Sequence, residues 1–179
     1  MKKIIWVCGV IAGIISVSWG VAGDALFGNS LSLTTRLIFG YATMLLAFSL
    51  IFVAIKNYRD TKNNGQITFG KALGIGLLIT LIASTVYVVI WLIDFSYFVP
   101  DFGEKYQGQV IAEMKASGKS AAEIQKQATE MAATFRKYNS SLTFRALFTY
   151  MEIAPVGIVI SLIAALILKR NVKPSVINA

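Results

Sequence analysis

The carboxylate of Glu152 stands inside an apolar window, residues 146–168, three positions before Pro155. An acidic group in such surroundings can bind a proton, a cation or a cationic group. It can also accept hydrogen bonds that lock helices together, or lie in water at the headgroup level. Pro155 lacks an amide hydrogen and crowds the carbonyl of Met151, so we expect the helix to bend or open near residues 151–155.

Partners for Glu152 should be basic or phenolic side chains near the same end of neighbouring helices. The candidates are Arg36, Arg145, Tyr41 and Tyr87. The rest of the sequence offers little chemistry. It has no His, none of the motifs HExxH, GxSxG, CxxC or the P-loop, and a single Cys, Cys8, which an apolar window favours as inert packing. We therefore expect no catalytic, cofactor or metal-binding residues, and no enzyme.

Four windows almost without charge set the architecture: residues 4–23, 37–55, 72–93 and 146–168. A helix rises about 1.5 Å per residue, so each window can cross a hydrocarbon core of about 30 Å. Hydrophobic residues make up 56% of the chain and the mean hydropathy is +0.66, too high for a soluble domain of this length. The sequence predicts an all-α membrane protein with four transmembrane helices in one domain, residues 1–179.

The first window could also be read as a secretory signal peptide, because Lys2 and Lys3 precede it and small residues close it at Gly23. Its apolar stretch is longer than a usual signal core, and it carries a GxxxG pair, Gly9 and Gly13. Both features favour a retained membrane anchor.

Basic residues predict the orientation, because short loops rich in Lys and Arg stay in the cytoplasm. Nine basic residues lie at the two termini and in the second connection, where Asp60 is the one acidic residue. The nine are Lys2, Lys3, Lys56, Arg59, Lys62, Lys71, Lys169, Arg170 and Lys173. We expect both termini inside. The net charge of +8 then faces anionic lipid headgroups, and no nucleic acid partner is expected.

The third connection, residues 99–142, is long enough to form an extracytoplasmic helical hairpin. We expect helices near 104–116 and 120–138, separated at Gly118, with Ser120 and Glu123 forming a capping box. Their apolar side includes Ile124, Met131 and Phe135. The hairpin is either a cap on the membrane helices or a docking surface. Aromatic residues around it suggest a lipid anchor, or alternatively a pocket for an apolar ligand.

Small residues four apart recur at Gly9 and Gly13 and at Gly70 and Gly74, and the second pair is followed by Gly76, Thr80 and Ser84 at four-residue steps. This spacing lets helix backbones approach closely in lipid. We favour contacts within one molecule over a dimer seam, although a homo-oligomer stays open.

Short motifs follow the second and third spans, and another lies within the fourth. They are Tyr58-Arg59-Asp60 with Gly65-x-Ile67-Thr68-Phe69-Gly70-x-Ala72, then Pro100-x-Phe102 with Tyr106, then Glu152-x-x-Pro155-Val156-Gly157. The residue types suit a turn at Asn63-Asn64-Gly65, a helix cap at Thr68, and an anchor from Arg59 and Asp60 to a helix end or a lipid phosphate.

In this order, and with four spans and a long outer loop, the chain resembles the bacterial membrane family called domain of unknown function 4199. The resemblance implies a bacterial inner membrane and no known activity. Two functions follow as hypotheses. One is an accessory or scaffold component that binds a membrane-protein partner through helix faces or the hairpin. The other is a small transporter or channel-like protein using Glu152. A third hypothesis, an enzyme acting on lipid, ranks last.

Overall fold

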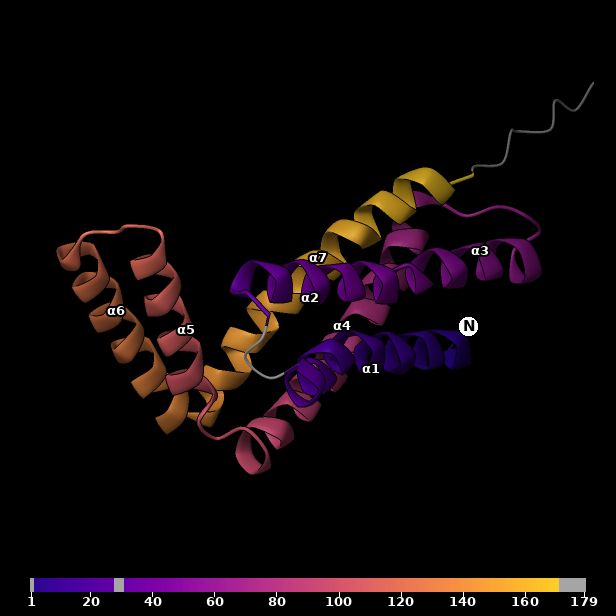
Figure 1. The fold of residues 1–179 in the computed structure, drawn as a ribbon. Helices are drawn as coiled ribbons and strands as arrows, with labels where there is room; N and C mark the ends of the chain where they lie inside the picture. Colours follow the sequence, from indigo (N-terminus) through magenta and orange to yellow (C-terminus); the bar gives the residue numbers. More distant parts are fainter. Residues whose placement is uncertain (1, 28–30, 171–179) are drawn as a thin grey trace, which may run out of the picture.

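A computed structural model describes residues 2–27 and 31–170, and these residues are almost entirely helical (Figure 1). The helices are α1 (Lys2–Phe27), α2 (Leu33–Phe48), α3 (Leu50–Lys62), α4 (Phe69–Tyr97), α5 (Phe102–Ala116), α6 (Ala121–Ser140) and α7 (Leu142–Leu168). Lys173, one of the basic residues that predict the orientation, lies outside the described residues.

Four stretches of helix are long and apolar enough to span a membrane: Lys2–Gly23, Leu33–Lys62, Phe69–Tyr97 and Leu142–Leu168. They contain the four apolar windows and confirm the all-α prediction for the described residues. The second stretch consists of two helices, because a turn at Ser49 separates α2 from α3. The Ser49 hydroxyl donates to the Leu46 carbonyl at 2.6 Å, a local bond that competes with the helical pattern.

Helix α4 is central, since its contacts with α7 and α1 are the most extensive in the molecule. α1 runs parallel to α4 and approaches it at two glycines. A Cβ on Gly9 would lie 2.7 Å from the Ile82 side chain, and a Cβ on Gly13 would lie 2.7 Å from the Ala83 carbonyl. The predicted internal contact is confirmed for this pair.

The second glycine pair behaves differently. A Cβ on Gly70 or Gly74 would meet no atom within 4 Å. The expectation of an internal contact is therefore wrong for this pair, which lies near the start of α4, where no neighbouring helix packs closely on it. The expected internal contact is confirmed farther along the same stripe at Gly76, because a Cβ there would lie 2.7 Å from the Ser161 hydroxyl.

Polar side chains join α4 to the antiparallel α7 inside the apolar core. The hydroxyls of Thr80 and Ser161 lie 3.1 Å apart, and both side chains are buried. Each also donates to a carbonyl one turn earlier, Thr80 to Gly76 at 3.0 Å and Ser161 to Gly157 at 2.7 Å. Small residues and paired hydroxyls are typical of contacts between membrane helices.

α5 and α6 form the predicted hairpin, which projects to one side of the other helices (Figure 1). The separation falls at the predicted place, with Gly118 at a φ of +75°. The Ser120 capping box is complete. Ile124, Met131 and Phe135 are half-buried, as expected for the side that packs. We call the end of the molecule that carries this pair the hairpin end, and the opposite end, with Lys62 and Lys169, the basic end.

Candidate functional site

The Glu152 carboxyl interacts with the hydroxyl of Tyr87 on α4. Tyr87 is buried, with 9% of its surface exposed. Tyr41 on α2 and Tyr138 on α6 lie close enough to Tyr87 to interact with it electrostatically. The structure therefore brings one of the candidate partners, Tyr87, to Glu152, and places Tyr41 near Tyr87.

The Glu152 side chain nevertheless reaches the outer surface of α7. It belongs to an exposed face that follows the helix toward the basic end: Phe148, Met151, Pro155, Val159 and Leu162. Glu152 lies six residues inside the apolar window that begins at residue 146, or roughly 9 Å along the axis. The interaction with Tyr87 of α4 agrees with the expectation that this carboxyl faces another helix of the same molecule, while part of the Glu152 side chain stays exposed at the surface of α7.

Pro155 does not interrupt α7, which continues from Leu142 to Leu168. A bend near residues 151–155 stays a prediction, whereas a break in the helix does not occur. Pro155 itself is exposed on the same face as Glu152.

Arg145 does not pair with Glu152, although it is one of the candidates. Its guanidinium is buried at the hairpin end and donates to the carbonyls of Tyr138 at 3.1 Å and Asn139 at 3.0 Å. It also stacks over the Phe95 ring, 3.9 Å from the centroid. Arg145 thus ties the last turn of α6 to α4 and α7. Arg36 stands near the start of α2, where its Nε donates to the Leu31 carbonyl at 3.5 Å.

Tyr138 belongs to the predicted apolar face of the second hairpin helix and is buried, but the sequence does not reveal its polar partners. The Trp91 indole donates to its hydroxyl at 2.5 Å, and the Thr149 hydroxyl lies 3.4 Å from the same atom. Tyr138 also makes edge contacts with Phe95, Phe135 and Phe148. The aromatic residues of this region pack on one another as the core of the hairpin junction, rather than around an open pocket for a ligand.

A second hairpin contact comes from Glu113 on α5. Its carboxylate accepts a hydrogen bond of 2.8 Å from the backbone amide of Leu33, in the first turn of α2. An acidic side chain at a helix N-terminus satisfies a free amide and interacts favourably with the helix dipole. The sequence gives no signal for this contact, because 80 residues separate the two partners.

At the basic end, the loop between α3 and α4 pairs with the end of α7. Ile67 and Arg170 exchange two backbone hydrogen bonds, of 3.0 and 2.8 Å. The Arg59 guanidinium binds Asp60 through two donors and reaches the Leu168 carbonyl at 3.5 Å. The interpretation as an anchor to a helix end is therefore supported by the contacts.

The remaining loop residues have structural roles too. Asn64 and Gly65 have positive φ values of 49° and 78°, as a tight turn requires, and the Gly65 amide donates to the Arg59 carbonyl at 2.8 Å. Thr68 caps α4 by accepting from the Lys71 amide. The Lys71 ammonium lies 5.9 Å from the ring centroid of Tyr58. Gly70 is exposed and contacts no other side chain closely.

Chemically, this arrangement supports hydrogen bonding and charge recognition. Among the described residues, no group of three or more Cys, Asp or Glu side chains has the arrangement of a metal site. A family model described as "Protein of unknown function (DUF4199)" matches residues 8–170. No curated protein matches the chain, and no solved structure matches it.

Proposed function

This chain belongs to the DUF4199 family of proteins of unknown function, and we propose that it is a non-enzymatic membrane component that binds another membrane protein through the exposed face of α7. The non-enzymatic part rests on the sequence, which lacks His and the common catalytic motifs. Accordingly, the protein acts by holding a partner, and its own polar groups serve recognition.

The observation that carries this proposal is the partial exposure of the Glu152 side chain on a helix that otherwise presents apolar side chains. An acidic residue inside a membrane helix is costly, up to roughly 2.5–3.5 kcal/mol at the helix centre on insertion scales. The hydroxyl of Tyr87 satisfies only part of the hydrogen-bonding capacity of the Glu152 carboxyl. A partner helix with a hydrogen-bond donor or a basic group would cover the open side and remove most of that cost.

The proposed placement follows the charges. Both termini and the loop from α3 to α4 face the cytoplasm of a bacterial cell, in the inner membrane, and the hairpin lies outside. The basic excess at one end of the described helices supports this orientation. The anchors of Arg145 and Glu113 support a hairpin that is held in a fixed position as an outer surface.

Site-specific photo-cross-linking in intact membranes tests the proposal. A cross-linker at Met151, which is 78% exposed beside Glu152, should give a discrete adduct with another membrane protein. The matched control is Ile14 of α1, which is 49% exposed on a different helix. Glu152→Leu should remove the adduct at Met151 while the protein still inserts. Equal labelling at Met151 and Ile14 contradicts the proposal, and an adduct of twice the mass identifies the partner as a second copy.

The second candidate is a small transporter or channel-like protein, favoured by the Glu152–Tyr87 pair beside Pro155. In an oligomer, the exposed faces of several α7 helices would surround a shared polar pathway lined by Glu152. Proton or cation flux into vesicles that contain the purified protein tests this function. Flux should disappear with Glu152→Gln, and a wild-type protein without flux excludes it.

A further inference from the structure

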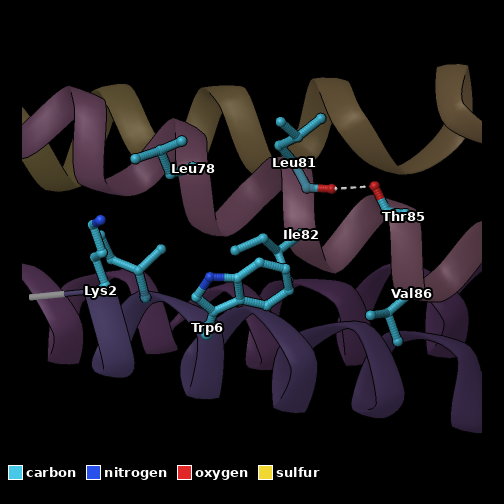
Figure 2. A pocket seen from close by; sticks show the side chains of 8 residues that line it. Lys2, Trp6, Leu78, Leu81, Ile82, Thr85 and Val86 are labelled. Atoms are coloured by element: carbon cyan, nitrogen blue, oxygen red, sulfur yellow. Dashed lines mark hydrogen bonds between the residues drawn. The ribbon is translucent and has the colours of Figure 1, made fainter.

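A groove between α1 and α4 opens to the surface near the basic end (Figure 2). Its volume is about 560 Å³. Its walls are Lys2, Ile5 and Trp6 of α1 and Leu78, Leu81, Ile82, Thr85 and Val86 of α4. This groove lies on another side of α4 from the Glu152 face, and neither the family nor the proposed function assigns it a role.

The shape of the groove follows from the glycines of α1. At Gly9 and Gly13 the two helix backbones approach closely, so the inner end of the groove is closed near Val86. Toward Lys2 the helices carry bulky side chains, with the Trp6 indole on one wall and Leu78 and Leu81 on the other (Figure 2). From Leu78 to Val86, the outermost lining residues of α4, the helical rise amounts to roughly 12 Å, somewhat less than half of a 30 Å hydrocarbon core. The groove is therefore slightly shorter than one leaflet is thick.

The lining favours an acyl chain in the interior. Its one hydroxyl, Thr85, already donates to the Leu81 carbonyl at 2.8 Å and accepts from the Tyr150 hydroxyl at 2.8 Å. A polar ligand would find no free partner at that end, whereas a hydrocarbon chain needs none. Apart from Lys2, Thr85 and the indole N–H of Trp6, the walls are apolar.

The positive charge of Lys2 at the mouth of the groove favours an anionic lipid headgroup. Lys2 is the only charged residue that lines the groove, and it stands at its basic end. On another side of α1 a smaller groove of about 350 Å³ is lined by two further cations, Lys3 and Lys62, and by no acid. Each Lys near a membrane surface contributes about 1 kcal/mol to the attraction of anionic lipid.

We propose that the α1–α4 groove holds one acyl chain of an anionic phospholipid, with the phosphate of that lipid on the Lys2 ammonium. The lipid belongs to the leaflet at the basic end. It would fill the space beside the close approach of the two helices at Gly9 and Gly13, and so it would stabilise the N-terminal half of α1.

Trp6 provides a direct probe, because brominated acyl chains quench the fluorescence of an indole that they contact. The full-length protein is placed in phosphatidylcholine vesicles that contain a small fraction of brominated phosphatidylglycerol or of brominated phosphatidylcholine. The difference between the wild type and Trp6→Phe isolates the Trp6 signal from that of Trp19 and Trp91. We expect the brominated anionic lipid to quench Trp6 several-fold more than the zwitterionic lipid at the same fraction.

Two substitutions separate a bound lipid from a general surface charge. Lys2→Gln should reduce the preference for the anionic lipid about fivefold, which corresponds to about 1 kcal/mol. Lys56→Gln removes the same charge from the basic end but from a residue that lines neither groove, and it should leave the preference nearly unchanged. Both variants keep the apolar core, so insertion should be unaffected.

Three outcomes would overturn the proposal. Equal quenching by the two lipids means that no headgroup is recognised, and equal loss with the two Lys variants means that only overall charge acts. Protection of Trp6 from both lipids, together with a cross-link from Leu78 to a second copy, means that a protein helix fills the groove. None of these outcomes bears on the adduct at Met151, so the two proposals fail independently.

Discussion

Glu152 and Arg145 are charged side chains on the same helix, two turns apart, yet their surroundings give them different roles. Arg145 is buried and satisfied by two backbone carbonyls and an aromatic face, which makes it a structural anchor. Glu152 has a single phenolic partner and an open side. Only the second arrangement leaves a group free to recognise something outside the molecule.

The Tyr87–Glu152 pair can be tested by a double-mutant cycle with Tyr87→Phe and Glu152→Gln. Hydrogen bonds between membrane helices contribute about 0.6 kcal/mol on average, and we expect a coupling energy of that order. The measurement is the free energy of unfolding in detergent micelles for the four proteins. Additive effects would show that the hydroxyl and the carboxyl do not interact in the folded protein.

Replacing Arg145 should loosen the hairpin. Arg145→Lys keeps the charge but loses the planar fork and the stacking on Phe95, so we expect a loss of about 2 kcal/mol in stability. Hydrogen exchange should accelerate in α5 and α6 and stay unchanged in α1. A variant that destabilises all helices equally would argue against a local anchor.

The individual partners were only partly predictable. Tyr87 could be placed near Glu152 because the topology puts both residues toward the same end of their helices. Tyr138 and Glu113 could not, since their partners Trp91 and Leu33 lie 47 and 80 residues away and only the packed hairpin brings them together. The aromatic band was visible in the sequence, but whether its rings face lipid or one another depends on tertiary packing.

At the scale of the helices, helix caps and breaks were predicted correctly where they depend on a single short segment of the chain. The Ser120 capping box, the Gly118 separation and the Thr68 cap depend on a few neighbouring residues, and all are present. The turn at Ser49 was missed because serine is compatible with an apolar helix. The Gly70–Gly74 pair was misread because spacing alone does not reveal which face of α4 has a neighbour.

The close approach of α1 to α4 predicts a graded response to alanine. Gly13→Ala should destabilise strongly, because its Cβ would meet the Ala83 carbonyl, a backbone atom that cannot easily move. At Gly20 a Cβ meets nothing within 4 Å, so Gly20→Ala should be neutral or stabilising by up to about 1 kcal/mol. Thermal unfolding of the two variants in the same detergent gives the comparison, and similar effects would contradict the packing described.

The start of α6 should depend on pH. The backbone amide and hydroxyl of Ser120 donate to the Glu123 carboxylate, which lowers the pKa of Glu123 below its ordinary value. Because the folded pKa lies below the unfolded one, the stabilisation is complete above the unfolded value and is lost as pH falls through the folded value.

Hydrogen exchange of the first turn of α6, compared at matched intrinsic rates between about pH 6 and about pH 3, measures this dependence. The wild type should lose protection toward acid, and Glu123→Gln should show a flat response. Acid sensitivity that persists in the Gln variant would assign the effect to another group.

For the whole molecule, orientation is the property that the charges predict and that labelling can decide. Cys8 is the single cysteine of the chain and is buried, so it gives little background for a reporter. A membrane-impermeant thiol reagent should modify a cysteine placed at Ser117, in the tip of the hairpin, but not one placed at Asn63. Modification of Asn63→Cys alone would invert the proposed topology.

The contact between α4 and α7 has a consequence for biosynthesis. The ribosome completes α4 well before it completes α7, the last helix described. While the hairpin is translated, the polar side chains of Thr80 and Ser84 therefore lack α7, the helix that packs on α4 in the finished fold. The molecule can close only after its C-terminal span has entered the bilayer. A chain that stops before α7 would leave these hydroxyls toward lipid, where quality-control proteases of the membrane can recognise an orphaned span.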